Sequence, residues 1–153
     1  MNARNLVTSL LLVVVFGSLG VFAWQRGMKP PATVPAEPAT NAADVLVTYF
    51  TTNVRCVSCR TIEELTRRAV AEGFPAELAA GKVVFRVVNT DLPEHQHFVD
   101  HYTITNKTVV VSHQRDGREV EWTGRQDVWL HFGEPETFFT YVREPIRSYL
   151  AAK

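Results

Sequence analysis

Two cysteines, Cys56 and Cys59, stand where an apolar strand pattern gives way to a helix pattern, and this junction constrains the fold more than any other feature. They are the only two cysteines among 153 residues, so no larger disulfide framework can be built. Upstream, the β-branched, apolar run 45–50 predicts a buried strand. Downstream, mostly apolar residues recur at the spacing of one helix face: Ile62, Leu65, Thr66, Ala69 and Val70. The pair therefore lies at a strand-to-helix turn.

This position predicts a reactive Cys56. The free backbone N–H groups and the dipole at a helix N-terminus favour the thiolate, which is the nucleophilic form of cysteine. Arg55 and Arg60 add positive charge on either side of the motif. We therefore expect Cys56 to be the reactive cysteine and both arginines to stabilise its thiolate.

The rest of the chain alternates strand and helix patterns. The predicted elements are a buried strand at 83–88, a helix from Pro93 to about Tyr102, strands at 108–112 and 119–122 joined by a turn at 115–117, and a helix from Pro135. Pro145 is expected to kink this last helix or to mark its weakest turn. The order β-α-β-α-β-β-α differs from that of ferredoxin-like metal chaperones, which also open a helix with CxxC but have no helix between their second and third strands. The sequence therefore predicts an α/β fold of another kind.

The first 24 residues predict a membrane anchor or a signal segment. Residues 6–24 carry no charge, and at 1.5 Å per residue these ~19 residues nearly span the ~30 Å hydrocarbon core of a bilayer. Small residues would also suit cleavage after Ala23, although the length of the apolar stretch favours an uncleaved anchor. Residues 25–43 are rich in Pro and Ala and predict an extended linker, which leaves 44–153 as one globular domain.

The domain is expected outside the cytoplasm. Arg4 and the amino terminus balance Arg26 and Lys29 across the apolar segment, so the positive charges leave the orientation open. An N-terminal export-type segment followed by one small domain favours a single-pass protein of the inner (cytoplasmic) membrane, with the domain on the periplasmic side. Cleavage near Ala23 would instead give a secreted or periplasmic protein. Disulfides persist in either place.

Over residues 44–153 the chain resembles the thioredoxin-like superfamily. The matching features are the strand that runs into the CxxC, Val88-Asn89-Thr90-Asp91, Tyr102 with Ile104, Lys107-Thr108-Val109-Val110-Val111 and a hairpin at Gly117. More narrowly, residues 54–63 and 141–147 are similar to small exported members named as the ArsF-type subunit of a nitrophenyl-compound nitroreductase. The resemblance implies a thioredoxin-like fold, with a central mixed sheet flanked by helices, and thiol–disulfide exchange with a partner protein.

The chain departs from the thioredoxin pattern around the cysteines. Arg55 replaces the usual Trp, and Val57-Ser58 replace the usual Gly-Pro, which changes the redox poise. Lys107-Thr108 occupy the place of the cis-proline that borders the thiol groove. A cis bond before a residue other than proline costs about 3 kcal/mol, so we expect a trans peptide and an altered groove. A Lys107 ammonium near Cys56 would favour the thiolate, whereas loss of the proline is also associated in the superfamily with metal or iron–sulfur binding.

Redox chemistry is the favoured role of the cysteine pair. The expected mechanism is attack by the Cys56 thiolate on a partner disulfide, after which Cys59, one helical turn on and more buried, resolves the mixed disulfide. One alternative is a thiolate site for zinc or an Fe–S cluster, which would need further ligands because two thiolates make half of a tetrahedral site. Another is a non-catalytic subunit that passes electrons to a membrane-associated reductase. No other cofactor is expected, and the balance of 16 basic and 16 acidic residues gives no reason to expect nucleic acid as a partner.

Other conspicuous residues are interpreted as structural. His97 and His101 share a helix face with His95 nearby, and the three are assigned to a solvated surface rather than a metal site. Trp122, Trp129 and Phe132 are assigned to cores and hairpin faces, and Arg67 and Arg68 to solvent. Thr48 stands about where many thioredoxins bury a carboxylate that assists proton transfer, so this helper is expected to be missing or replaced by water.

Overall fold

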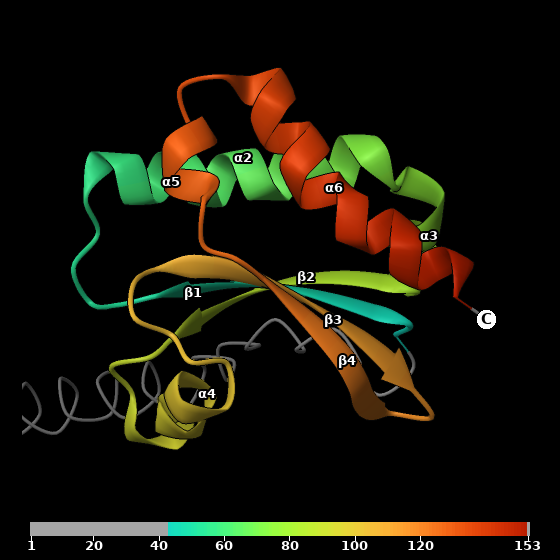
Figure 1. The fold of residues 1–153 in the computed structure, drawn as a ribbon, viewed down its shortest axis with the longest axis horizontal. Coiled ribbons are helices and arrows are strands. Elements are labelled where there is room, and N and C mark those ends of the chain that lie inside the picture. The colour runs from blue at the N-terminus through green and yellow to red at the C-terminus, as the bar shows by residue number, and fades with distance from the viewer. Residues whose placement is uncertain (1–42, 153) are drawn as a thin grey trace, which may run out of the picture. The chain divides into compact units, whose positions relative to one another are not determined.

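The computed structural model describes residues 43–152 (Figure 1). The predicted membrane or signal segment 1–24, its orientation, and residues 25–42 of the predicted linker lie outside the described residues. Within 43–152, no helix combines the length and the apolar character needed to cross a bilayer.

A mixed sheet of four strands forms the centre of this part of the chain. The strands are β1 (Val45–Thr51), β2 (Val83–Asn89), β3 (Thr108–Arg115) and β4 (Arg118–Arg125), in the spatial order β2-β1-β3-β4. β1 pairs with β2 in parallel and with β3 in antiparallel orientation, and β3 and β4 form an antiparallel hairpin. All seven residues of β1 are buried, as expected for a central strand covered on both faces. The carboxyl end of β1, which leads to the CxxC, therefore lies in the middle of the sheet.

Helices cover both faces of the sheet. α2 (Val57–Gly73), α3 (Pro75–Ala79), α5 (Val128–His131) and α6 (Pro135–Ala151) lie on one side, and the short η2 (Pro93–His95) with α4 (Gln96–His101) lies on the other (Figure 1). The predicted order β-α-β-α-β-β-α is confirmed, with α3 and α5 as short additions. Together with the strand order, it makes the domain a thioredoxin-like fold.

The β3–β4 hairpin and α6 differ in detail from the prediction. Both strands are longer than predicted because β3 continues through buried polar residues, where Gln114 donates a hydrogen bond to Ser112 over 3.0 Å. The turn between them places Asp116 and Gly117 at φ of 53° and 72°, a conformation that glycine adopts without strain. Pro145 lies inside α6 and is buried, and the helix continues through it.

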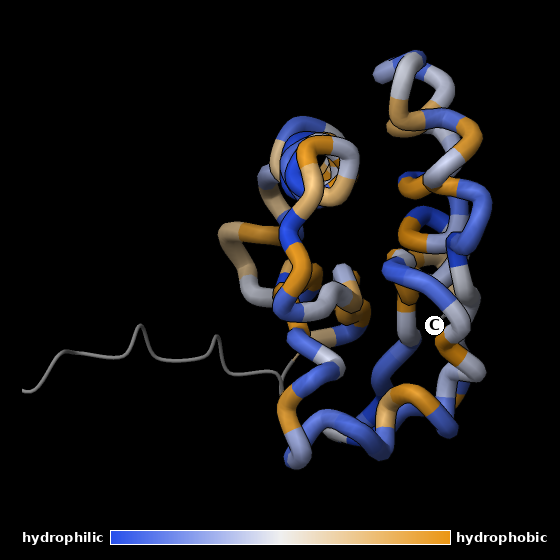
Figure 2. Tube along the Cα trace, turned by 90° about the vertical axis from the view of Figure 1, so that its left-hand side faces the viewer, coloured by the Kyte–Doolittle hydropathy of each residue, from blue (hydrophilic) through white to orange (hydrophobic). Residues whose placement is uncertain are grey.

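Two apolar cores lie on opposite faces of the sheet because side chains alternate along each strand. Between the sheet and α2 with α6, the larger core contains Val47, Tyr49, Ile62, Phe138 and Ile146, among others. Under α4, a smaller core consists of Phe50, Val88, Tyr102 and Val110, with Phe98 and Ile104 packed against it. Polar and apolar residues alternate along the chain in Figure 2, as expected for helices and strands that bury one side.

Candidate functional site

Cys56 and Cys59 form a disulfide at the start of α2. This is the strand-to-helix junction that the sequence predicts. Cys56 is the N-cap residue, and its Sγ accepts a hydrogen bond from the backbone N–H of Cys59 over 3.1 Å. Cys56 is exposed, whereas Cys59 is 1% exposed. An incoming thiolate can therefore reach Cys56 but not Cys59.

The two flanking arginines differ in their contacts. Arg55 forms an ion pair with Glu63, one turn into α2, so part of its charge is neutralised. Arg60 is exposed, and its backbone N–H donates to the carbonyl of Cys56. Within residues 43–152, neither guanidinium hydrogen-bonds a cysteine sulfur. The predicted stabilisation of the thiolate by these arginines would therefore act at longer range.

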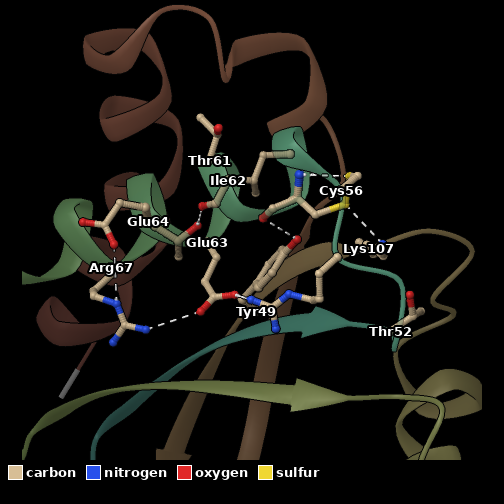
Figure 3. Close-up of polar contacts among 12 residues, drawn as sticks. Tyr49, Thr52, Cys56, Thr61, Ile62, Glu63, Glu64, Arg67 and Lys107 are labelled. Carbon is tan, nitrogen blue, oxygen red and sulfur yellow. Dashed lines mark hydrogen bonds and ion pairs between the residues drawn. A yellow bond between two sulfur atoms is a disulfide. The ribbon is translucent and has the colours of Figure 1, made fainter.

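Lys107 lies at the cysteine pair, and the sulfur that it contacts directly is that of Cys59. Its Nζ is 3.1 Å from Sγ of Cys59 (Figure 3). The same ammonium donates to the backbone carbonyl of Val54. Because the two sulfurs are bonded to each other, Lys107 also lies near Cys56, and its direct contact is with the buried Cys59. Trp129 on α5 donates from Nε1 to the carbonyl of Lys107 over 2.7 Å and so fixes the backbone of this residue. Among the described residues all peptide bonds are trans, including the one before Thr108.

Thr108 lies beside Lys107 in sequence but on a different face. It is the first residue of β3 and is buried, and alternation along the strand places it on the same side as Val110, which belongs to the core under α4. Its hydroxyl donates to the carbonyl of Val109. Of the two residues predicted to replace the cis-proline, Lys107 therefore reaches the sulfur and Thr108 does not.

Thr48 lies on the α4 side of the sheet and is buried. Its hydroxyl accepts a hydrogen bond from Nε of Arg86 over 2.9 Å, and the Arg86 guanidinium lies over the ring of Phe98 on the α4 side. The residue of β1 that faces the cysteine pair is the next one, Tyr49. Thr48 carries no carboxylate, and the expectation that a proton-transfer helper is missing or replaced by water at this position stays a prediction.

Tyr49 is a site residue that sequence reasoning missed. Its hydroxyl donates to the backbone carbonyl of Cys59 over 3.0 Å and lies beneath the first turn of α2 (Figure 3). Burial raises the pKa of Tyr49, and the negative charge of Glu63 raises it further. The phenol therefore stays protonated and remains a hydrogen-bond donor. The signal that could have found it is the alternation along β1, which groups Tyr49 with Val45 and Val47.

Three large apolar side chains are exposed on segments near the cysteine pair. Val54 and Val57 flank Cys56 and are 70% and 84% exposed, and Leu130 on α5, next to Trp129, is 77% exposed. Large apolar residues with this much exposure are candidates for contact with another molecule. We call these three residues, Val54, Val57 and Leu130, the apolar rim.

A cleft of about 340 Å³ begins at Lys107 and extends toward α4. Its wall is apolar where Phe50, Val99 and Ile104 contribute and polar where Asp91 and Gln96 contribute. It lies on the α4 side of the sheet, beside the loop that carries the residues preceding the CxxC. A side chain of a bound partner could enter it while the partner's sulfur is at Cys56.

The remaining candidates occupy structural positions. His97 and His101 are exposed and His95 is half-buried, with its Nδ1 2.8 Å from the carbonyl of Asn89. Arg67 and Arg68 are exposed and pair with carboxylates on α2. Trp129 and Phe132 pack against the larger core, whereas Trp122 is partly exposed and contacts Tyr102.

A metal site at the cysteines would need more than these two ligands. In the part of the chain that the structure describes, no three His, Cys, Asp or Glu side chains are grouped so that they could hold an ion. Zinc or a cluster at Cys56 and Cys59 would therefore require the reduced pair and ligands from outside residues 43–152, for example from a second chain.

Comparisons with known proteins give distant structural likenesses. No protein-family model and no curated protein matches the chain. Among solved structures, it is similar to the zinc-bound form of human ERp44, with 23% identity and a TM-score of 0.45 over 73% of this chain and 29% of that one. It is also similar to thioredoxin from Trypanosoma brucei brucei, with 22% identity and a TM-score of 0.41 over 70% of this chain and 80% of that one. The chain thus spans less than a third of the ERp44 structure, and the fold assignment rests on strand order and connections.

Proposed function

We propose that this protein is a thiol–disulfide oxidoreductase that exchanges its Cys56–Cys59 disulfide with a partner protein. The observation that carries this proposal is the asymmetry of the pair: one sulfur is exposed at a helix N-terminus and the other is buried behind it. A structural disulfide has no need of this asymmetry, and a loop closed over a sequence separation of 3 constrains the unfolded chain little.

The exposure of Cys56 and the burial of Cys59 support different roles for the two cysteines. A partner thiolate attacks Sγ of Cys56, the Cys56–Cys59 bond breaks, and Cys59 leaves as a thiolate while Cys56 carries the partner in a mixed disulfide. In the reverse direction, the Cys56 thiolate attacks a partner disulfide and Cys59 resolves the product. The N–H of Cys59, directed at Sγ of Cys56, stabilises negative charge on that sulfur in both directions.

The partner is a protein segment that contacts the apolar rim. Val54 and Val57 lie on either side of the attacked sulfur, so a segment that carries a cysteine would bury both as it approached. The cleft beside Lys107 can receive a neighbouring side chain of the same segment.

The location of this activity belongs to the same proposal. The apolar segment 6–24 supports membrane anchoring, the linker 25–43 would hold the domain away from the bilayer, and the extracytoplasmic side would supply partners that carry disulfides. The narrower similarity to ArsF-type subunits supports a variant of the proposal in which the pair passes electrons to a membrane-associated reductase. In both versions the partner reacts first with the sulfur of Cys56.

Competitive alkylation of the reduced full chain tests the assignment of Cys56. The chain is reduced, treated briefly with limiting iodoacetamide in detergent, and each cysteine is quantified by mass spectrometry. Cys56 should carry most of the label at early times because it is exposed and lies at the helix N-terminus. Equal labelling of both cysteines would contradict the assignment, and thiols that resist both labelling and oxidation, together with stoichiometric metal, would favour a metal site instead.

A further inference from the structure

Disulfide exchange at Cys56 leaves a negative charge on the buried sulfur of Cys59, and this charge needs to be stabilised. When the disulfide is attacked at Cys56, the bond electrons remain on Sγ of Cys59. Cys59 is 1% exposed, so the resulting thiolate has almost no contact with water. Burial of an unpaired anion is costly and would oppose bond cleavage.

Lys107 supplies the missing positive charge. Its Nζ lies 3.1 Å from Sγ of Cys59 and is held there by the carbonyl of Val54, while Trp129 fixes the backbone of Lys107 from the other side. The ammonium is thus in position before the thiolate forms. Glu63, a nearby anion on α2, is paired with Arg55. Lys107 is the cation within the described residues that hydrogen-bonds a sulfur of the pair.

The hydrogen bond between Lys107 and the sulfur of Cys59 stabilises the reduced pair more than the disulfide. A disulfide sulfur is neutral and a weak acceptor, whereas a thiolate forms a charge-assisted hydrogen bond with an ammonium. The reduced pair also gains from the N–H of Cys59, which stabilises the thiolate of Cys56. Each sulfur therefore has its own stabilising donor, and both donors favour the dithiol state over the disulfide.

We propose that Lys107 is the counter-ion of the Cys59 thiolate and that it biases the pair toward accepting electrons, so that the substrates are reduced protein dithiols. This inference rests on the proposed exchange function and gives it a direction. The first partner thiolate attacks Cys56, and Cys59 leaves against Lys107. The second partner thiolate then attacks the partner sulfur of the mixed disulfide, and Cys56 leaves as a thiolate. The partner loses two electrons and becomes a disulfide, the pair gains them, and the partner's two protons pass to solvent or to the new thiolates.

The redox equilibrium of the full chain with glutathione tests this bias. In Lys107→Met the equilibrium should shift toward the disulfide by about tenfold, which is about 30 mV for a two-electron couple. Lys107→Arg keeps the charge and should lie closer to the unchanged chain. The matched control is Lys82→Met, which removes the same charge from an exposed residue just before β2. Equal shifts in Lys107→Met and Lys82→Met would overturn the proposal.

A second readout separates a counter-ion from a residue that only supports the fold. In Cys56→Ser, Cys59 is the remaining thiol, and its apparent pKa can be followed by thiolate absorbance. Adding Lys107→Met to this variant should raise that pKa, because the anion loses its partner. An unchanged pKa would overturn the role of Lys107 and leave the exchange function intact. A full chain that fails to equilibrate with glutathione at all would overturn both.

Discussion

Tyr49 and Lys107 contact Cys59 from two different parts of the sheet. Tyr49 on β1 donates to its backbone carbonyl, and Lys107, directly before β3, donates to its sulfur. The first contact holds the opening turn of α2 against the sheet, and the second responds to the charge on the sulfur. The hydrogen bond from Tyr49 thus fixes the position of the Cys59 backbone, and the one from Lys107 acts on the Cys59 sulfur.

Removal of the Tyr49 hydroxyl tests how much its hydrogen bond to the carbonyl of Cys59 stabilises the fold. Tyr49→Phe should destabilise the oxidised chain by about 1 kcal/mol, since one buried hydrogen bond is lost and the ring still fills the core. Urea unfolding of the full chain measures this. Tyr141→Phe is the matched control, because within residues 43–152 the Tyr141 hydroxyl makes no hydrogen bond. A stability of Tyr49→Phe equal to that of the control would show that the contact with Cys59 contributes nothing.

The candidate site could be predicted from sequence only where the signal is local. Cys56 at the start of a helix follows from a few neighbouring residues, and the structure places it there. Tyr49 could be predicted only in part: alternation along β1 groups it with Val45 and Val47, but every residue of β1 is buried, so polarity gives no sign of which group faces α2. The sulfur that Lys107 reaches also depends on packing between residues separated by 48 positions.

At the scale of elements, α4 is joined to the hairpin by one polar cluster on the side of the sheet away from α2. Tyr102, directly after α4, donates to Glu119 on β4, and His101 contacts the other carboxylate oxygen of Glu119. Burial raises the pKa of Tyr102, and both the hydrogen bond to Glu119 and the charge of Glu119 raise it further. The neutral phenol is therefore the form that the folded domain requires.

This raised pKa gives stability a defined dependence on pH. Below pH 10, the ordinary pKa of a tyrosine, Tyr102 is neutral in both the folded and the unfolded chain. Above it, the unfolded chain ionises first, so stability should fall as pH rises. Tyr102→Phe should be less stable at neutral pH, where it loses the bond to Glu119, but should decline less steeply above pH 10. Urea unfolding at a series of pH values measures both slopes; parallel slopes would contradict the assignment.

Helix starts marked by proline were predicted correctly, whereas the end of a strand that buries polar residues was not. Pro93 and Pro135 each open a helix at the position predicted. The end of β3 was placed too early, at Ser112, because the polar His113 and Gln114 after it suggest a loop, although the structure buries both within the sheet. Their polar groups are accommodated by strand pairing and by the hydrogen bond from Gln114 to Ser112, and these depend on tertiary structure.

At the scale of the whole molecule, the thioredoxin-like fold brings together three segments that are far apart in sequence. The start of α2 carries the cysteine pair, Lys107 directly precedes β3, and α5 carries Trp129 and part of the apolar rim. The strand order could be inferred from the order of elements, since β-α-β-α-β-β-α with a CxxC at the first helix fits few arrangements. The membrane segment and linker remain predictions from the sequence alone.

Trapping of a partner on the full chain tests the central claim, that Cys56 exchanges disulfides with another protein, most directly. Cys59→Ser removes the resolving sulfur, so when the Cys56 thiolate attacks the disulfide of an oxidised partner, the mixed disulfide should accumulate and disappear on reduction. Cys56→Ser is the matched control and should trap nothing, because Cys59 is buried. Reduction-sensitive adducts on Cys59→Ser alone are the predicted result. Equal adducts on both variants, or none on either, would contradict the account.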